Sequence, residues 1–67
     1  MKSAQEIREL LEIYIKSEFE PIRMMCFRMD IDQATVASFR RNSKKTSIRT
    51  IMRMYNYLKD RVKDGNN

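Results

Sequence analysis

The chain has 67 residues, a formal net charge of +5 and a hydrophobic fraction of 42%, with one Gly, one Pro and no Trp. This length suits one domain with a single core, and the scarcity of Gly and Pro argues against a turn-rich sheet. No apolar run approaches the roughly 20 residues that a membrane span needs, and the first residues lack the apolar segment of a signal peptide. We therefore expect a single all-helical domain over residues 1–67, located in the cytoplasm.

The composition gives little support to catalysis or metal binding. Cys26 is the only cysteine and so has no internal disulfide partner, and the absence of His removes the usual zinc ligands. A cysteine nucleophile would also have no His to act as its base. We expect Cys26 to be a small core residue, and we expect no enzyme activity, no metal site and no cofactor.

The charged residues are distributed unevenly along the chain. Residues 1–39 carry five basic and seven acidic side chains, whereas residues 40–67 carry nine basic and only two acidic ones. Positive charge concentrated in one region suits a polyanionic partner, because each neutralised phosphate releases a condensed counterion. The alternative is a solvated cationic surface without a specific partner.

The first predicted helix covers about residues 4–17. Ser3 and Glu6 have the spacing of a capping box, which places the start of the helix near Ala4. The apolar side chains recur at helical spacing and predict a core stripe: Ile7, Leu10, Leu11, Tyr14 and Ile15. Ile13 falls outside this stripe.

Two shorter helices are predicted at residues 21–29 and 33–41, joined by a tight turn. Pro21 suits the first position of a helix, and Asp30 tolerates the left-handed backbone of a turn. Asp32 is a good N-cap residue and Asn42 can adopt the left-handed conformation that ends the second of these helices. The residues expected to face inward are Ile22, Met25, Cys26, Met29, Ile31, Val36 and Phe39, which leaves Met24 and Phe27 near the surface.

A fourth helix is predicted at residues 47–63, followed by a frayed tail at 64–67. Thr46 or Ser47 can cap its start. The apolar residues at helical spacing predict its core face: Ile48, Ile51, Met52, Tyr55, Leu58 and Val62. The predicted fold is thus a compact bundle of four to five helices.

The segment from about residue 22 to 58 resembles the helix-turn-helix domain of the phage lambda repressor and Cro family. The resemblance covers roughly half of the chain and rests on Met25-Cys26 in the first helix of the unit, Ile31 after the turn, Val36 and Phe39 in the second helix, and Ser47 to Met52 at the start of the next. In such a unit the second helix usually reads DNA.

The resemblance implies two groups of DNA contacts. The residues expected over base edges are Gln33, Ala34, Thr35 and Ser38. The residues expected at the phosphate backbone are Arg40, Arg41, Asn42, Ser43, Lys44 and Lys45. Phosphate contacts position a protein on the duplex, and base contacts supply sequence specificity.

Two functions of different class follow. In the first, the chain is a small phage-type transcriptional regulator that binds double-stranded operator DNA, as a homodimer whose second helices lie about 34 Å apart. In the second, the same fold is an antirepressor or modulator that docks on a partner repressor protein and blocks its DNA binding. Carboxylates and a proline are poor phosphate ligands and exposed apolar side chains suit a protein partner, so five residues favour the second function: Glu18, Phe19, Glu20, Met24 and Phe27.

Overall fold

The computed structural model describes residues 2–62, and they form an all-helical bundle. It contains α1 (Ala4–Lys16), α2 (Ile22–Met29), α3 (Gln33–Arg41), the short 3-10 helix η1 (Ser43–Lys45) and α4 (Ile48–Leu58). No strand occurs within residues 2–62. The all-α fold expected from the sequence is therefore confirmed.

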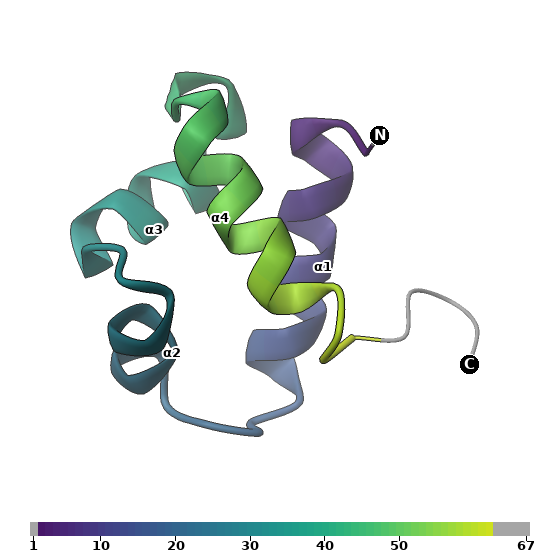
Figure 1. The fold of residues 1–67 in the computed structure, drawn as a ribbon, viewed down its shortest axis with the longest axis vertical. Helices are drawn as coiled ribbons and strands as arrows, with labels where there is room; N and C mark the ends of the chain where they lie inside the picture. Colours follow the sequence, from purple (N-terminus) through teal and green to yellow (C-terminus); the bar gives the residue numbers. More distant parts are fainter. Residues whose placement is uncertain (1, 63–67) are drawn as a thin grey trace.

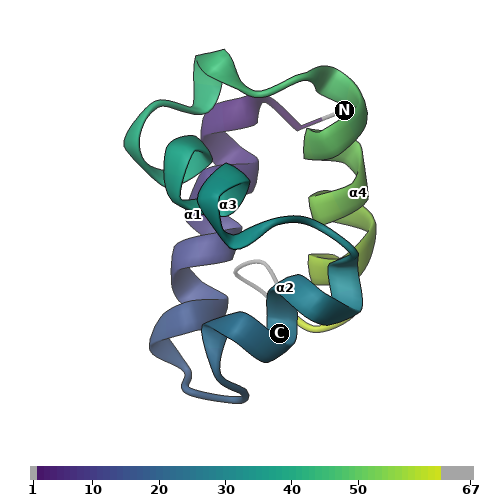
Figure 2. The ribbon, with the colours of Figure 1, turned by 90° about the vertical axis from the view of Figure 1, so that its left-hand side faces the viewer.

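The four α-helices surround one core. α4 packs along α1, and α2 contacts both α3 and α4 (Figure 1). In the view turned by 90°, α1 and α4 stand on either side of the bundle and α2 lies across its lower end (Figure 2). Every α-helix contributes to the buried apolar cluster: Ile7, Leu10, Leu11, Tyr14, Met25, Cys26, Met29, Ile31, Val36, Phe39, Ile51, Met54, Leu58 and Val62.

The start of α1 is built as predicted. The Ser3 hydroxyl accepts a hydrogen bond from the Glu6 amide at 3.2 Å, and the Glu6 carboxylate accepts one from the Ser3 amide at 2.8 Å. This reciprocal pair satisfies two amides that the helix itself leaves without partners. Ile13, outside the apolar stripe, is 52% exposed.

A three-residue turn joins α2 to α3. α2 begins at Ile22 and not at Pro21, which is its N-cap residue with an extended backbone. Asp30 adopts the expected left-handed conformation (φ 60°), and Ile31 is buried behind it. Asp32 occupies the N-cap position of α3, but its side chain makes no capping hydrogen bond.

The end of α3 differs from the prediction. Asn42 is extended (φ −153°) and not left-handed, because its side chain instead accepts a hydrogen bond from the Lys44 amide at 3.1 Å and caps η1. The left-handed residue that was not expected is Glu18 (φ 55°), in the connection between α1 and α2.

The core face of α4 is rotated relative to the predicted one. Ile48 is 68% exposed and Met52 is only half-buried, whereas Met54, absent from the predicted stripe, is fully buried. Methionines at both 52 and 54 make two rotations compatible with the apolar pattern, and packing against α1 selects the one that buries Met54.

α4 also ends earlier than predicted. Its last residue is Leu58, and a turn over residues 59–61 then returns Val62 to the core, where the Val62 amide donates to the Leu58 carbonyl at 2.8 Å. The predicted end of this helix at 63 and the predicted tail at 64–67 lie outside the described residues.

Candidate nucleic-acid interface

The outer face of α3 carries the four predicted base-contacting residues. Gln33 and Ala34 are exposed in its first turn, and Thr35 and Ser38 are half-buried. Their direction is set from the opposite side of the helix, where Val36 and Phe39 are buried in the core. None of the four predicted base-contacting residues is therefore part of the core.

A shallow hollow joins this face to the start of α4. Ala34, Thr35 and Ser38 from α3 line it together with residues that precede and begin α4, and its volume is about 340 Å³. The lining residues from that second segment are Lys45, Thr46, Ser47 and Thr50. Of these four residues, only Lys45 was predicted from the sequence to contact DNA. The hydroxyl groups of Thr46, Ser47 and Thr50 were the sequence signal that could have identified the other three.

The segment from the end of α3 to the first turn of α4 carries unpaired positive charge. Arg41, Lys44, Lys45 and Arg49 are all exposed, and their side chains make no hydrogen bond or ion pair within residues 2–62. The segment that they occupy lies at the upper end of the bundle in Figure 1. Side chains without internal partners are available to an external anion such as phosphate. Arg49 was not among the predicted contacts.

Arg40, predicted to contact the phosphate backbone, is instead paired within the protein. Its Nε donates to Glu12 Oε2 at 2.7 Å and its Nη2 to Glu12 Oε1 at 3.1 Å, a bidentate pair between α3 and α1. Arg8 adds a hydrogen bond from its Nη1 to the Arg40 carbonyl at 2.9 Å. The hydrogen bond from Arg40 lowers the pKa of Glu12, and the same bond raises the pKa of Arg40.

Two further predicted backbone contacts have structural roles. Ser43 is buried, with 8% of its surface exposed, so it is not accessible to DNA in this conformation. Asn42 is exposed, but its side-chain oxygen caps η1. Of the six residues predicted to meet phosphate, three are exposed cations whose side chains are unpaired within residues 2–62: Arg41, Lys44 and Lys45.

The turn before α3 is held by α4. Arg53 Nη1 donates to the Asp30 carbonyl at 3.1 Å and lies 3.6 Å from the Asp30 carboxylate. The turn before α3 is thus linked to α4, and Arg40 links the last turn of α3 to α1. Side chains far apart in the sequence thus fix the position of α3 in the bundle.

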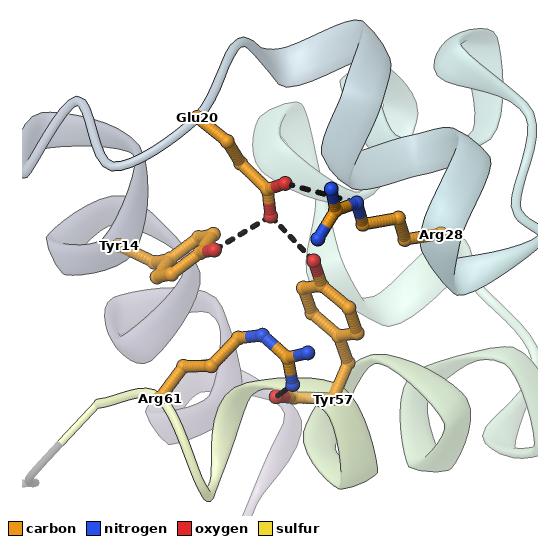
Figure 3. Close-up of polar contacts among 5 residues, drawn as sticks. All are labelled: Tyr14, Glu20, Arg28, Tyr57 and Arg61. Atoms are coloured by element: carbon orange, nitrogen blue, oxygen red, sulfur yellow. Dashed lines mark hydrogen bonds and ion pairs between the residues drawn. The ribbon is translucent and has the colours of Figure 1, made fainter.

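Glu20 lies at the centre of a polar cluster beneath the connection between α1 and α2 (Figure 3). The Tyr14 hydroxyl donates to Glu20 Oε2 at 2.6 Å, and the Tyr57 hydroxyl donates to the same oxygen. Arg28 Nε lies 3.5 Å from Glu20 Oε1. The Glu20 side chain is only 11% exposed, so Glu20, which the sequence placed among the residues that favour a protein partner, is not an accessible surface carboxylate.

The cluster shifts the pKa values of its members. Burial raises the pKa of Glu20, but hydrogen bonds from Tyr14 and Tyr57 and the charge of Arg28 outweigh it, and the net pKa is lowered. Burial and the hydrogen bond to Glu20 raise the pKa of Tyr14 and of Tyr57. The Arg61 guanidinium lies 3.7 Å from the centre of the Tyr57 ring and adds a cation–π contact. Cluster geometry therefore favours an ionised carboxylate between two neutral phenols.

The other residues of the predicted protein-binding group lie on the surface. Phe19 is 76% exposed, Met24 42% and Phe27 80%, and Glu18 is also exposed. Phe19 lies beside Tyr14, with 6.1 Å between the ring centres. Met24 and Phe27 share the outer face of α2, where they line a shallow hollow with Arg23.

Cys26 is buried in the core, and burial raises the pKa of its thiol, with a smaller contribution from the charge of Asp32. A raised pKa disfavours the nucleophilic thiolate. Within residues 2–62, no cluster of three His, Cys, Asp or Glu side chains is placed to hold a metal ion. No helix in the same range is long and apolar enough to cross a membrane.

Comparison of the chain with models of protein families, with curated proteins and with solved structures found no match.

Proposed function

We propose that this protein is a small transcriptional regulator that binds double-stranded DNA through α3. The observation that carries the proposal is the hollow in which Ala34, Thr35 and Ser38 of α3 meet Lys45. Exposed polar groups on one helix next to unpaired cations on the following segment match the division of labour at a DNA interface, where bases are read and phosphates are neutralised.

In this proposal α3 enters the major groove, and Gln33 is the principal base reader. A Gln side chain can bond both N6 and N7 of adenine, and a good bidentate contact contributes about 1–3 kcal/mol of discrimination. Arg41, Lys44 and Lys45 then lie against phosphates and set the position of α3. Arg49 adds a fourth cation on the same segment.

The inward position of Glu20 supports the proposal. A carboxylate at the start of α2 would repel phosphate if it faced solvent. Here it is directed toward Tyr14 and Tyr57 and is paired with Arg28, which leaves Glu18 as the exposed carboxylate of this connection.

The test is selection from a library of random duplex DNA by the full chain, followed by measurement of the Gln33→Ala variant on the selected sequence. We expect an enriched motif, and we expect Gln33→Ala to lose discrimination at one base pair while retaining its affinity for random DNA. Gln5→Ala is the matched control, because Gln5 is exposed on α1. Failure to enrich any motif would exclude sequence-specific DNA binding, and equal losses on selected and random DNA would exclude Gln33 as the base reader.

A second prediction concerns the salt dependence of DNA binding. The double variant Lys44→Ala/Lys45→Ala should weaken binding to all sequences alike and reduce the slope of log affinity against log salt by about 2, since each phosphate that is no longer neutralised lowers the slope by about 1. Lys59→Ala, which removes an exposed lysine beyond the end of α4, should leave the slope unchanged. An unchanged slope in the double variant would contradict the proposed role of Lys44 and Lys45 at phosphate.

The antirepressor is the second candidate function, and the exposure of Phe19, Met24 and Phe27 favours it. Large exposed apolar side chains are typical anchors of protein interfaces. The discriminating assay is a mobility shift on DNA around the chain's own gene, run with this chain alone and with any repressor encoded beside it, in the presence and absence of this chain. A shift by this chain alone supports the regulator. Loss of that repressor's shift when this chain is added supports the antirepressor, and Phe27→Ala or Met24→Ala should then restore the repressor's shift without changing the helical content.

A further inference from the structure

The outer face of α2 presents an apolar ring between two hollows. Phe27, 80% exposed, lines one hollow of about 380 Å³ together with Arg23 and Met24. It also lines a second hollow of about 370 Å³ that extends to the turn before α3. The other residues of this second hollow are Cys26, Asp30, Ile31 and Asp32.

Opposite charges lie at the two ends of this face. Arg23, in the first turn of α2, is exposed and has no ion-pair partner within residues 2–62. The Asp30 side chain, at the C-terminal end of α2, is 96% exposed, although Arg53 Nη1 lies 3.6 Å from its carboxylate. A free cation, an apolar centre and an exposed carboxylate thus follow one another along the helix.

When a second copy of this face runs in the opposite direction, the cation of each copy lies toward the carboxylate of the other and the apolar centres face each other. We infer that two copies of the chain associate through antiparallel α2 helices related by a two-fold axis. With the axis between positions 25 and 26, Met24 of one copy lies opposite Phe27 of the other, and each Phe27 ring occupies the hollow beside the other copy's Met24. In this register Arg23 of each copy is level with Arg28 of the other, which is paired with Glu20 of its own chain, and Asp30 lies two residues further along, within the reach of an Arg side chain.

A two-fold contact of this kind repeats each interaction twice, which is the usual symmetry of homodimers. Antiparallel helices also place the positive end of one helix dipole near the negative end of the other. We call the surface formed by Arg23, Met24, Phe27 and Asp30 the α2 patch. Phe27 and Arg23 take no part in the proposed DNA contacts, and the α2 patch gives a role to both of these exposed residues.

The dimer should be weak in solution. Stable interfaces bury about 800 Å² per partner, more than four side chains provide. Its role rests on the proposed function: a dimer carries two α3 helices, and two half-sites on one duplex raise the effective concentration of the second copy. We therefore expect association that is measurable at high protein concentration and strengthened on DNA.

The test is sedimentation equilibrium of the full chain over a wide concentration range. The average mass should rise from 8.1 kDa for the monomer toward twice that value. Phe27→Glu should raise the dissociation constant at least tenfold. Ile13→Glu, an equal change of charge at an exposed apolar residue of α1, should leave it within about twofold. Arg23→Glu should weaken the dimer and Arg23→Lys should not.

The outcomes separate this inference from the proposed function. A chain that stays monomeric at all concentrations, or an Ile13→Glu variant that weakens association as much as Phe27→Glu, overturns the α2 dimer, even if a DNA motif is enriched. A dimer that depends on Phe27 supports the inference, even if no motif is enriched and the DNA proposal fails. A monomer whose Phe27 is required only for binding another protein overturns the dimer and assigns the α2 patch to that partner instead.

Discussion

Phe39→Ala should lower the free energy of unfolding by about 3–5 kcal/mol, the range typical of removing a fully buried aromatic side chain. Phe39 is 0% exposed and anchors α3 to the core. Small domains have a total stability of only about 5–15 kcal/mol, so much of the variant should be unfolded at physiological temperature. Thermal and urea denaturation followed by far-ultraviolet circular dichroism measure the loss.

Phe27→Ala is the matched control for this prediction. It removes the same side chain from α2, where 80% of it is exposed, and the expected change at low protein concentration is within about 0.5 kcal/mol. Comparable losses in the two variants would show that Phe39 is not the core residue that its burial indicates.

Glu20→Gln should give the second largest loss, about 1.5–3 kcal/mol at neutral pH, in line with the contribution of hydrogen bonds to a charged group. The substitution keeps the shape of the side chain but removes the charge that Tyr14, Tyr57 and Arg28 face. Glu18→Gln, in the same connection but exposed, is the control and should have little effect. Urea denaturation of the three proteins side by side measures the difference.

The pH dependence identifies the cause of this loss. The pKa of Glu20 is lowered from an ordinary value of 4.5 in the folded chain, so its ionised form stabilises the fold above that value. This contribution is lost as the pH falls through 4.5 and then through the folded pKa. The stability difference between the wild type and Glu20→Gln should therefore shrink on acidification. Protonation of Glu12, whose pKa is also lowered, destabilises both proteins equally at low pH, so it does not affect the stability difference between them. A difference that is independent of pH would show that the charge of Glu20 is not the cause.

Alkaline conditions act on the same cluster through the phenols. The pKa values of Tyr14 and Tyr57 are raised in the folded chain from the ordinary value of 10.0, so the neutral phenols stabilise the fold below that value. Their contribution is lost as the pH rises through 10.0 and then through the folded pKa values. Absorbance titration of tyrosine ionisation should show Tyr14 and Tyr57 ionising above the ordinary value of 10.0 in the wild type, and it should show this elevation reduced in Glu20→Gln.

The candidate DNA site was only partly accessible to sequence reasoning. The face of α3 followed from Val36 and Phe39, because two apolar residues three positions apart mark the buried side of a helix. The pairing of Arg40 with Glu12 could not be predicted from the sequence, because the two residues are 28 positions apart and meet only when α1 packs beside α3. The number of arginines in the sequence therefore overstated the charge that is available to phosphate.

The sequence by itself determined the features that depend on neighbours along the chain. The capping box at Ser3 and Glu6, the left-handed turn at Asp30 and the inward faces of α1, α2 and α3 all arise from interactions within about one helical turn. Only the tertiary structure decided the rotation of α4, the inward direction of Glu20 and the internal pairing of Arg40. Each depends on which groups from distant segments lie nearby, and packing around a shared core brings those groups together.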